Sequence, residues 1–209
     1  MSILTNWGYS LTGVDEVPGI MTLTEFNTLT AEKYLADSRV ESDIRAATAA
    51  IRNYCGWHIY PAASCELNTT LYDKAVTVND RMLLIQLPAT FVSAIESIQI
   101  GSEVIDETYV LMPNGILRVY GLSWSHLKLW TPVVVRYTAG LPEGTAEDVM
   151  AVLADRVTHA LASSEGVQSE TAGGVSVTYN ATWANGAKVT ALADDTKEVL
   201  SHYRLRGVF

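Results

Sequence analysis

The sequence has few of the residues that build disulfide frameworks, metal sites or nucleic-acid-binding patches. Its 209 residues include 2 cysteines and 4 histidines, and 14 lysines and arginines stand against 23 aspartates and glutamates. The formal net charge is therefore −9. A protein that wraps nucleic acid needs clustered Lys and Arg to neutralise phosphates, so this balance argues against such a patch. An acidic wall would instead repel the phosphate backbone and let DNA slide past.

The two cysteines and the shortage of long apolar runs indicate where the chain folds. Cys55 and Cys65 show no disulfide framework and are interpreted as reduced thiols. The N-terminus lacks the basic region and apolar run of a secretion signal. No uncharged apolar stretch approaches the roughly 18 to 20 residues that a membrane helix needs. The chain is therefore expected to fold in the cytosol, without a membrane partner, and to stay there or join a particle assembled there.

Motifs that carry catalysis are also scarce. The segment Gly121-Leu122-Ser123-Trp124-Ser125 resembles a nucleophile elbow until its last position, where Ser replaces the required Gly, and is read as a turn. No Gly-rich phosphate loop precedes a helix. His58 lies near Cys55, but no second pair completes a zinc site, and the other histidines, at 126, 159 and 202, have no such neighbour. The sequence predicts no enzyme, no metal site and no cofactor.

The 48% of hydrophobic residues are sufficient for a packed core, and their spacing predicts helices at both ends of the chain. Thr22 and Glu25 have capping-box spacing and predict a short helix running towards Leu35. Apolar residues at alternating four- and three-residue steps from Val40 to Tyr54 predict a second helix, which Gly56 ends. A further helix is expected from Thr145. A final short helix is expected to be capped by Asp194 or Asp195.

Between these helices, strand patterns run from about Leu67 to Tyr137. Asn114-Gly115 separates two apolar runs and is the strongest short hairpin signal in the chain. We expect an α+β fold: a helical bundle core with an inserted small, mostly antiparallel β-sheet and an extended C-terminal segment. The predicted divisions are an N-terminal arm at 1–20, a helical core at 21–58 and 141–166, a β subdomain at 59–140, a flexible loop or hairpin at 167–193, and a C-terminal helix and tail at 194–209.

Two groups of residues are candidates for an interface. Trp183 lies in a polar loop, where burial within one subunit is hard to arrange, so an interface role and core packing are equally plausible. Trp130, just before the last strand of the sheet, is expected in the core. The C-terminal tail is basic and apolar in an otherwise acidic chain; it supplies the candidates Tyr203, Arg204, Leu205, Arg206 and Phe209.

The order of these segments also carries a resemblance. Its clearest stretch is Val133-Val134-Val135-Arg136-Tyr137-Thr138-Ala139-Gly140, followed by Pro142 and by Glu147-Asp148-Val149 at the start of a helix. Together with Leu87-Pro88, Gly115-Ile116-Leu117-Arg118 and the closing Leu200-Ser201-His202-Tyr203-Arg204, it resembles the head-to-tail adaptor (head completion or connector) proteins of long-tailed bacteriophages over about residues 20 to 206. The glycine-rich N-terminal arm has no counterpart in that pattern.

The resemblance implies a structural virion protein, assembled in the cytoplasm of a bacterial host. It implies a ring of about a dozen copies that docks on the portal protein, extends the DNA channel and offers a platform to the stopper and tail. DNA would pass through without specific binding, and the C-terminal tail would reach the portal. The alternatives are another ring of the same neck (a stopper or tail terminator), an acidic scaffold unrelated to phage, and a ligand-binding or enzymatic domain.

Overall fold

The computed structural model describes residues 2–31, 38–79, 82–105, 109–122, 128, 130–163, 169–172, 175–178 and 192–205. The chain divides into two compact units. We call them the sheet unit (Met1–Pro18, Cys55–Gly144 and Tyr203–Phe209) and the helix unit (Gly19–Tyr54 and Thr145–His202). Each unit is therefore built from segments that are distant in the sequence.

The larger sheet of the sheet unit has six strands in the order β1-β2-β3-β10-β6-β7, and every neighbouring pair is antiparallel. Its centre is β10, whose residues Val133, Val135 and Tyr137 are fully buried and alternate with exposed or half-buried neighbours, as expected of a strand with one face on a core. The strands are β1 Ser2–Leu4, β2 Ser10–Thr12, β3 Ala63–Thr70, β6 Val92–Ile100, β7 Glu103–Val104 and β10 Pro132–Ala139.

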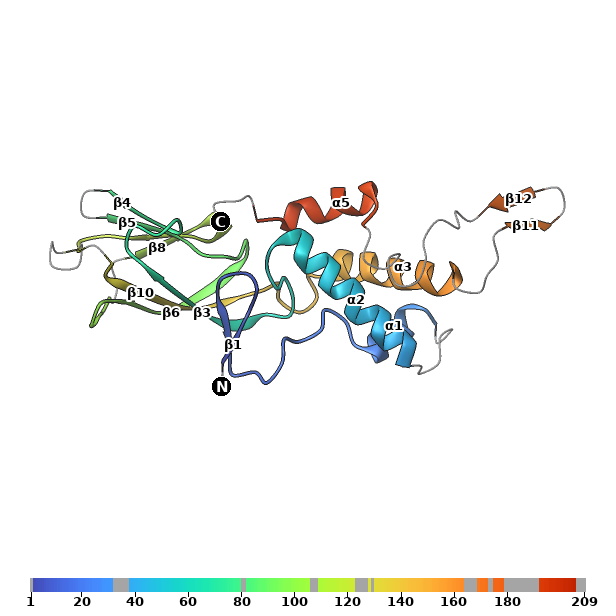
Figure 1. Ribbon diagram of the computed structural model, residues 1–209, viewed down its shortest axis with the longest axis horizontal. Helices are drawn as coiled ribbons and strands as arrows, with labels where there is room; N and C mark the ends of the chain where they lie inside the picture. The colour runs from blue at the N-terminus through green and yellow to red at the C-terminus, as the bar shows by residue number, and fades with distance from the viewer. Residues whose placement is uncertain are drawn as a thin grey trace. The chain divides into compact units, whose positions relative to one another are not determined.

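The second sheet has the order β4-β5-β9-β8, again antiparallel throughout, and lies over the first in Figure 1. Leu83, Ile85 and Leu117 are fully buried on one of its faces, and together with the buried face of β10 they form the core of the unit. The strands are β4 Val76–Asn79, β5 Met82–Gln86, β8 Tyr109–Met112 and β9 Ile116–Val119.

The turn between β8 and β9 is the predicted Asn-Gly turn. It spans Pro113–Gly115, and both Asn114 and Gly115 have positive φ, of 63° and 72°. Gly115 is required for a second reason, because a Cβ added there would lie 2.2 Å from the carbonyl oxygen of Ala89. The hairpin prediction is confirmed, and glycine is the residue that permits both the conformation and the close approach of the backbone.

A buried polar cluster joins the first hairpin to the rest of the sheet unit. The backbone N–H of His58 donates to the hydroxyl of Tyr9 (3.0 Å), and that hydroxyl lies 2.7 Å from Nδ1 of the same histidine. Nε2 lies 2.9 Å from the carbonyl oxygen of Ala139. Because a carbonyl only accepts, Nε2 carries the ring proton and Nδ1 accepts from Tyr9. His58 is a core histidine that ties three segments together.

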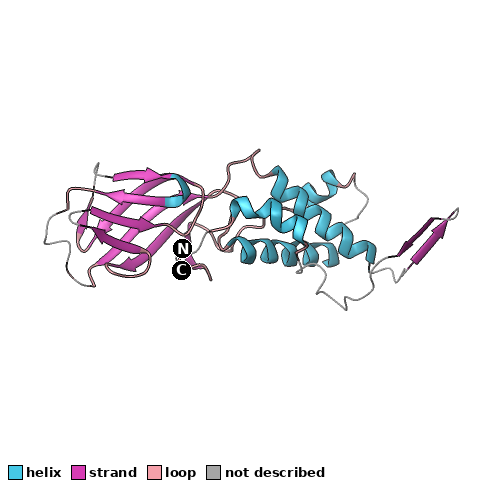
Figure 2. Cartoon of the chain, turned by 90° about the horizontal axis from the view of Figure 1, so that it is seen from above, coloured by secondary structure: helices cyan, strands magenta, loops and turns pink. Residues whose placement is uncertain are grey.

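The described residues of the helix unit include two long helices and two short ones (Figure 2). Thr22 and Glu25 form the predicted capping box at the start of the first helix, and Gly56, with φ of +81°, ends the second as predicted. The helices are α1 Leu23–Leu29, α2 Ser38–Cys55, α3 Glu147–Ser163 and α5 Asp194–Leu200. The hairpin of β11 Ser169–Ala172 and β12 Val175–Thr178 also belongs to this unit.

The predicted fold class is wrong in its balance. A helical bundle core with a small inserted sheet was expected, whereas among the described residues strands predominate over helices and form antiparallel sheets of six and four strands besides the β11–β12 pair. The strands that were missed explain the error: β1 and β2 come from the segment expected to be an arm, and β2 pairs with β3 across more than fifty residues of sequence, at Ser10 with Glu66. Such short strands have no alternating pattern long enough to recognise locally.

Candidate interfaces

The first part of the C-terminal tail, Tyr203–Leu205, is anchored within the sheet unit. The indole N–H of Trp57 donates to the carbonyl oxygen of Tyr203 (2.7 Å), and the backbone N–H of Leu205 donates to that of Cys55 (2.9 Å). The Leu205 side chain lies over Gly56, where an added Cβ would be 3.6 Å from Leu205 Cβ. These contacts fix the point from which the last four residues of the chain continue.

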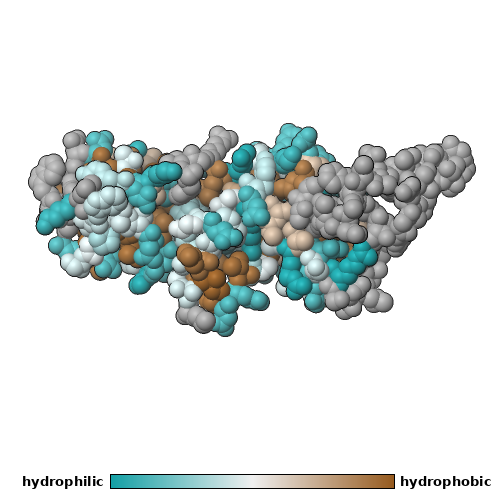
Figure 3. All heavy atoms as spheres, viewed as in Figure 1, coloured by the Kyte–Doolittle hydropathy of each residue, from teal (hydrophilic) through white to brown (hydrophobic). Residues whose placement is uncertain are grey.

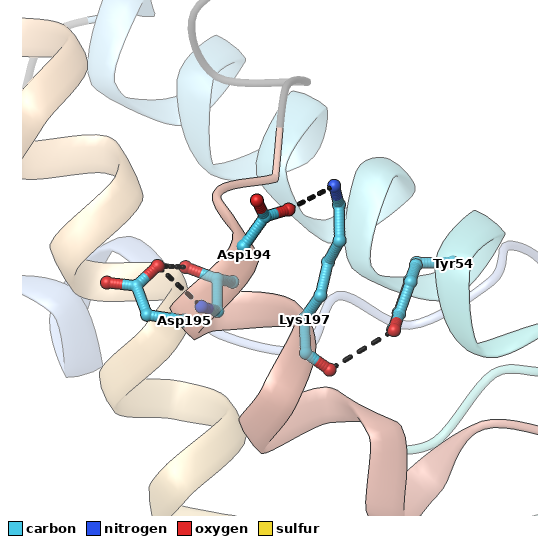
Figure 4. Close-up of polar contacts among 5 residues, drawn as sticks. Tyr54, Asp194, Asp195 and Lys197 are labelled. Carbon is cyan, nitrogen blue, oxygen red and sulfur yellow. Dashed lines mark hydrogen bonds and ion pairs between the residues drawn. The ribbon is translucent and has the colours of Figure 1, made fainter.

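The helix that precedes the tail, α5, is held by short polar contacts (Figure 4). The Tyr54 hydroxyl donates to the carbonyl oxygen of Lys197 (3.1 Å), which links α5 to α2. The Lys197 ammonium donates to Asp194 (2.9 Å), and this hydrogen bond lowers the pKa of the Asp194 carboxyl. Asp195 accepts from the backbone N–H of Thr196 (2.6 Å).

The predicted cap of this helix is wrong. The residue at the N-cap is Ala193, which makes no side-chain capping bond, and Asp194 and Asp195 lie in the first turn of the helix. Carboxylates in the first turn still interact favourably with the helix dipole, so the acidic pair has a helix-start role one position later than expected.

Trp130 is a second correction, because 70% of it is exposed and it does not pack in the core. It has a positive φ of 65° in the turn before β10. Tyr72, with φ of 68°, is 55% exposed and lies at the same end of the sheet, since the neighbouring residues Leu71 and Thr131 share a backbone hydrogen bond (2.9 Å). Two large aromatic side chains are thus presented to solvent by left-handed backbone, which non-glycine residues adopt infrequently.

Other exposed apolar side chains lie on the outermost strands of the two sheets. Figure 3 shows apolar residues gathered over the β1–β2 hairpin, where Leu4 is 79% exposed. Val104 on β7 is 58% exposed, and Val110 on β8 is 51% exposed. Isolated apolar residues are ordinary on a protein surface, but apolar residues on unpaired strand edges are candidates for contact with another chain.

The outer face of the six-stranded sheet is polar by contrast. Glu96 is the extra residue of a β-bulge opposite Arg136 and Tyr137, and its carboxylate accepts from the hydroxyls of Ser64 (2.9 Å) and Thr138 (2.8 Å). Beside it, Arg136 donates from Nε to Glu66 across the strands (2.7 Å), and this hydrogen bond lowers the pKa of the Glu66 carboxyl. On this face Glu66 is paired with a cation, whereas the carboxylate of Glu96 is hydrogen-bonded by two neutral hydroxyls.

The part of the chain that the structure describes holds no group of three or more His, Cys, Asp or Glu residues placed to bind a metal ion. Cys55 and Cys65 are buried free thiols, as expected, and burial raises the pKa of each to about 12. Such thiols are inert at neutral pH because the thiolate is the reactive form. His58 is fully engaged in the core. The chemistry of these groups is that of a packed interior.

Comparison with known proteins decides the family. The description "Head completion protein" belongs to a family that the chain matches over residues 19–204. The chain is a member of the head completion protein family. No curated protein matches the chain in a sequence search.

Two solved structures share the fold of this head completion protein. A chain in "Neck of empty GTA particle computed with C6 symmetry" is 16% identical, with a TM-score of 0.55, over 95% of this chain and 97% of that one. A chain in "Virion of native gene transfer agent (GTA) particle" is 17% identical, with a TM-score of 0.54 and the same coverage. The resemblance to head-to-tail adaptor proteins is thus confirmed, and the protein is a structural bacteriophage head completion protein and not an enzyme.

The residues predicted for its interfaces are only partly placed. Tyr203 and Leu205 are half-buried against the sheet unit and Arg204 is exposed. Trp183, Arg206 and Phe209 lie outside the described residues, as do most of the nucleophile-elbow-like segment and the end predicted for the first helix.

Among the helices that are described, none has the length and apolar character needed to span a bilayer. The exposed strand edges had no counterpart in the sequence prediction, because an edge is defined only once strand order is known.

Proposed function

We propose that this head completion protein forms a ring in the neck of the particle, docks on the portal, extends the DNA channel and provides the platform for the stopper and tail. The observation that carries the proposal is the family match over residues 19–204. The likeness of the fold to a chain from the neck of a gene transfer agent particle supports the same location, since it spans nearly the whole of both chains.

The charge of the chain is compatible with this role. A channel protein must surround DNA without retaining it, and the formal net charge of −9 disfavours the counterion-releasing contacts that hold a phosphate backbone. The guanidinium of Arg136 is paired with the carboxylate of Glu66, so it is less available to bind a DNA phosphate. DNA is therefore expected to pass through the ring without specific binding.

Electron microscopy of particles that carry this protein tests the proposal directly. We expect a closed ring of its copies between portal and tail. A ring located below that level, at the stopper or tail-terminator position, would assign the protein to another component of the neck. Absence of the protein from purified particles would refute the proposal.

Within this proposal, the portal contact is made by the end of the chain, with Arg204, Arg206 and Phe209 as its contact residues. Trp183 contributes to the contact with a neighbouring subunit or the portal. The anchoring of Leu205 on Cys55 and Gly56 supplies a fixed origin for the remaining residues.

Two truncations separate the anchored segment, which includes Arg204, from the contact residues Arg206 and Phe209. A chain that ends at Leu205 keeps the hydrogen bonds to Trp57 and Cys55, so it should fold normally and fail to join portal-containing heads. A chain that ends at Tyr203 also loses the Leu205 anchor and should be less stable as well. Unchanged head binding by the chain that ends at Leu205 would exclude a portal contact by the final residues.

A further inference from the structure

In the described part of the chain, the two edge strands of the four-stranded sheet have no second strand beside them and contain no charged residue. Its outermost strands are β4, Val76–Asn79, and β8, Tyr109–Met112, and within the described part of the chain each pairs with one strand only. Neither strand contains a charged residue or a proline. Tyr109 is 36% and Val110 51% exposed. Soluble proteins usually protect free edges with charges, prolines or very short strands, because an open edge recruits another strand.

The six-stranded sheet differs at one edge. Its last strand, β7, has two residues, and one of them is the charged Glu103. That edge is short and charged, which is the usual protection against pairing. The contrast singles out the four-stranded sheet as the one whose two edges are both left available.

The backbone of β4 presents hydrogen-bonding groups to the outside. The N–H of Gln86 donates to the carbonyl oxygen of Ala75 (2.8 Å), so these two residues form a hydrogen-bonded pair of the β4–β5 ladder. In an antiparallel ladder such pairs alternate, which turns the backbone groups of Val76 and Val78 away from β5. The N–H of Val76 already donates to the carbonyl oxygen of Asp73 (2.9 Å). Val78 is therefore the residue of β4 that presents both its N–H and its carbonyl oxygen to the outside.

Strand direction makes the two edges complementary. The sheet has an even number of strands and each neighbouring pair is antiparallel, so β4 and β8 run in opposite directions. When a second copy is placed beside the first in the same orientation, β8 of one copy runs antiparallel to β4 of the next. Rotation about a ring axis preserves that orientation, so the same junction repeats until the ring closes.

We infer that β8 of one copy pairs with β4 of the next, so that the four-stranded sheets of neighbouring subunits join into one continuous sheet around the ring. This inference rests on the proposed ring and specifies how its subunits are joined. The two strands match in length, with four residues each. Pairing brings the neighbouring subunit over the exposed side chains of Tyr109 and Val110. Main-chain hydrogen bonds hold such a junction, and the apolar residues along it add burial.

Engineered disulfides test the junction in assembled particles. Val110 lies opposite the half-buried Arg118 on the face of the sheet away from the core, and the exposed side chains of Thr77 and Asn79 lie on the same face of β4. Cysteine is introduced at Val110 together with either Thr77→Cys or Asn79→Cys, because cross-strand partners bring Cβ atoms within about 4.5–5.5 Å. The natural cysteines are buried, with pKa values raised to about 12, and stay unreactive.

Mild oxidation should give a ladder of covalent multimers with one of the two double-cysteine chains, and no ladder with any single-cysteine chain. Efficient dimers from Val110→Cys alone would mean that β8 pairs with β8 of a symmetry mate, which overturns the inference. Rings visible in particles without cross-links in either double variant would overturn it and leave the proposed function intact. Particles that contain the protein without a ring would refute both.

A backbone substitution gives an independent readout. Val78→Pro removes the outward N–H from an edge strand, a position where proline is tolerated within the subunit itself. Val78→Ala is the matched control, because it shortens the side chain and keeps the N–H. Both variants should show the same circular dichroism spectrum as the parent, and only Val78→Pro should be lost from rings. Equal incorporation of the two variants would exclude β4 from the junction.

Discussion

The hydroxyl of Tyr137 is expected to reduce the stability of the sheet unit. Tyr137 is fully buried on β10, and its hydroxyl has no hydrogen-bond partner among the described residues. Burial also raises its pKa well above the usual value, with smaller contributions from Cys65 and Tyr9. The substitution Tyr137→Phe removes a buried hydroxyl whose loss of hydration is not compensated by a hydrogen bond. It should therefore stabilise the folded protein.

The size of the effect follows from the cost of an unsatisfied group. A buried hydroxyl without a partner costs roughly 1–3 kcal/mol, and deletion of one oxygen leaves a small void that takes back part of the gain. We expect Tyr137→Phe to raise the free energy of unfolding by about 1 kcal/mol. Tyr9→Phe is the matched control: the Tyr9 hydroxyl makes two hydrogen bonds to His58, so its loss should lower the free energy of unfolding by about 2–3 kcal/mol.

Urea denaturation followed by tryptophan fluorescence measures both changes. Trp57 is fully buried next to His58, with ring centroids 5.6 Å apart, so it reports on this region of the sheet unit. The midpoint should move to higher urea for Tyr137→Phe and to lower urea for Tyr9→Phe, with unchanged slopes. A destabilised Tyr137→Phe protein would show that the hydroxyl is satisfied in solution and that the argument from its isolation is wrong.

Three further predictions concern the sheet unit. The pKa of Cys55 and that of Cys65 are raised from 9.0 to about 12, so both thiols contribute stability below pH 9 that is lost as the pH rises towards 12. Replacing both with alanine should flatten the fall in the free energy of unfolding between pH 8.5 and 10, to which each thiol contributes a slope of at most about 1.4 kcal/mol per pH unit. Gly115→Ala should cost about 3 kcal/mol or more in the same assay, because the new methyl would meet the carbonyl of Ala89; a near-neutral effect would contradict the close approach. Arg136→Gln breaks an exposed ion pair and should change the free energy of unfolding by less than about 1 kcal/mol. A larger loss of unfolding free energy at both low and high salt would contradict the assignment of this pair as a weak surface interaction.

The inferred junction between subunits also bears on assembly. Open, uncharged strand edges on a free subunit favour aggregation unless the correct partner covers them. A subunit that joins its neighbours only on a template has to tolerate those edges before assembly. Their short length, four residues on each of β4 and β8, limits the affinity of one copy for another in solution. The ring then gains stability from repetition of the same junction around a closed circle.

Local sequence signals placed several elements correctly. The capping box of Thr22 and Glu25, the glycine stop after α2 and the Asn114-Gly115 hairpin each depend on residues within a few positions of one another. Long amphipathic stripes also predicted α2 and α3, because their period of 3.6 residues repeats over several turns. These are the elements whose physical cause lies within one stretch of chain.

The errors arose where the cause lies elsewhere in the chain. The hairpin of β1 and β2 contains three residues in each strand, and it is stabilised by pairing with β3 and by the Tyr9–His58 contacts, both distant in sequence. Trp130 was expected in the core from its position before a strand, but its left-handed backbone turns it to solvent. The predicted helical core was overestimated for the same reason, since strands with distant partners carry weak local patterns.

The sequence alone determined the family, the acidic charge, the lack of a disulfide framework and the absence of recognisable catalytic motifs, because these depend on residue identity and order. Only the tertiary structure decided which strands lie at the edges of the sheets and where the tail is anchored. Strand order depends on contacts between segments far apart in the chain, and no local pattern encodes it. The candidate junction at β4 and β8 is therefore a property of the folded subunit, and so is the complementary direction of its two edges.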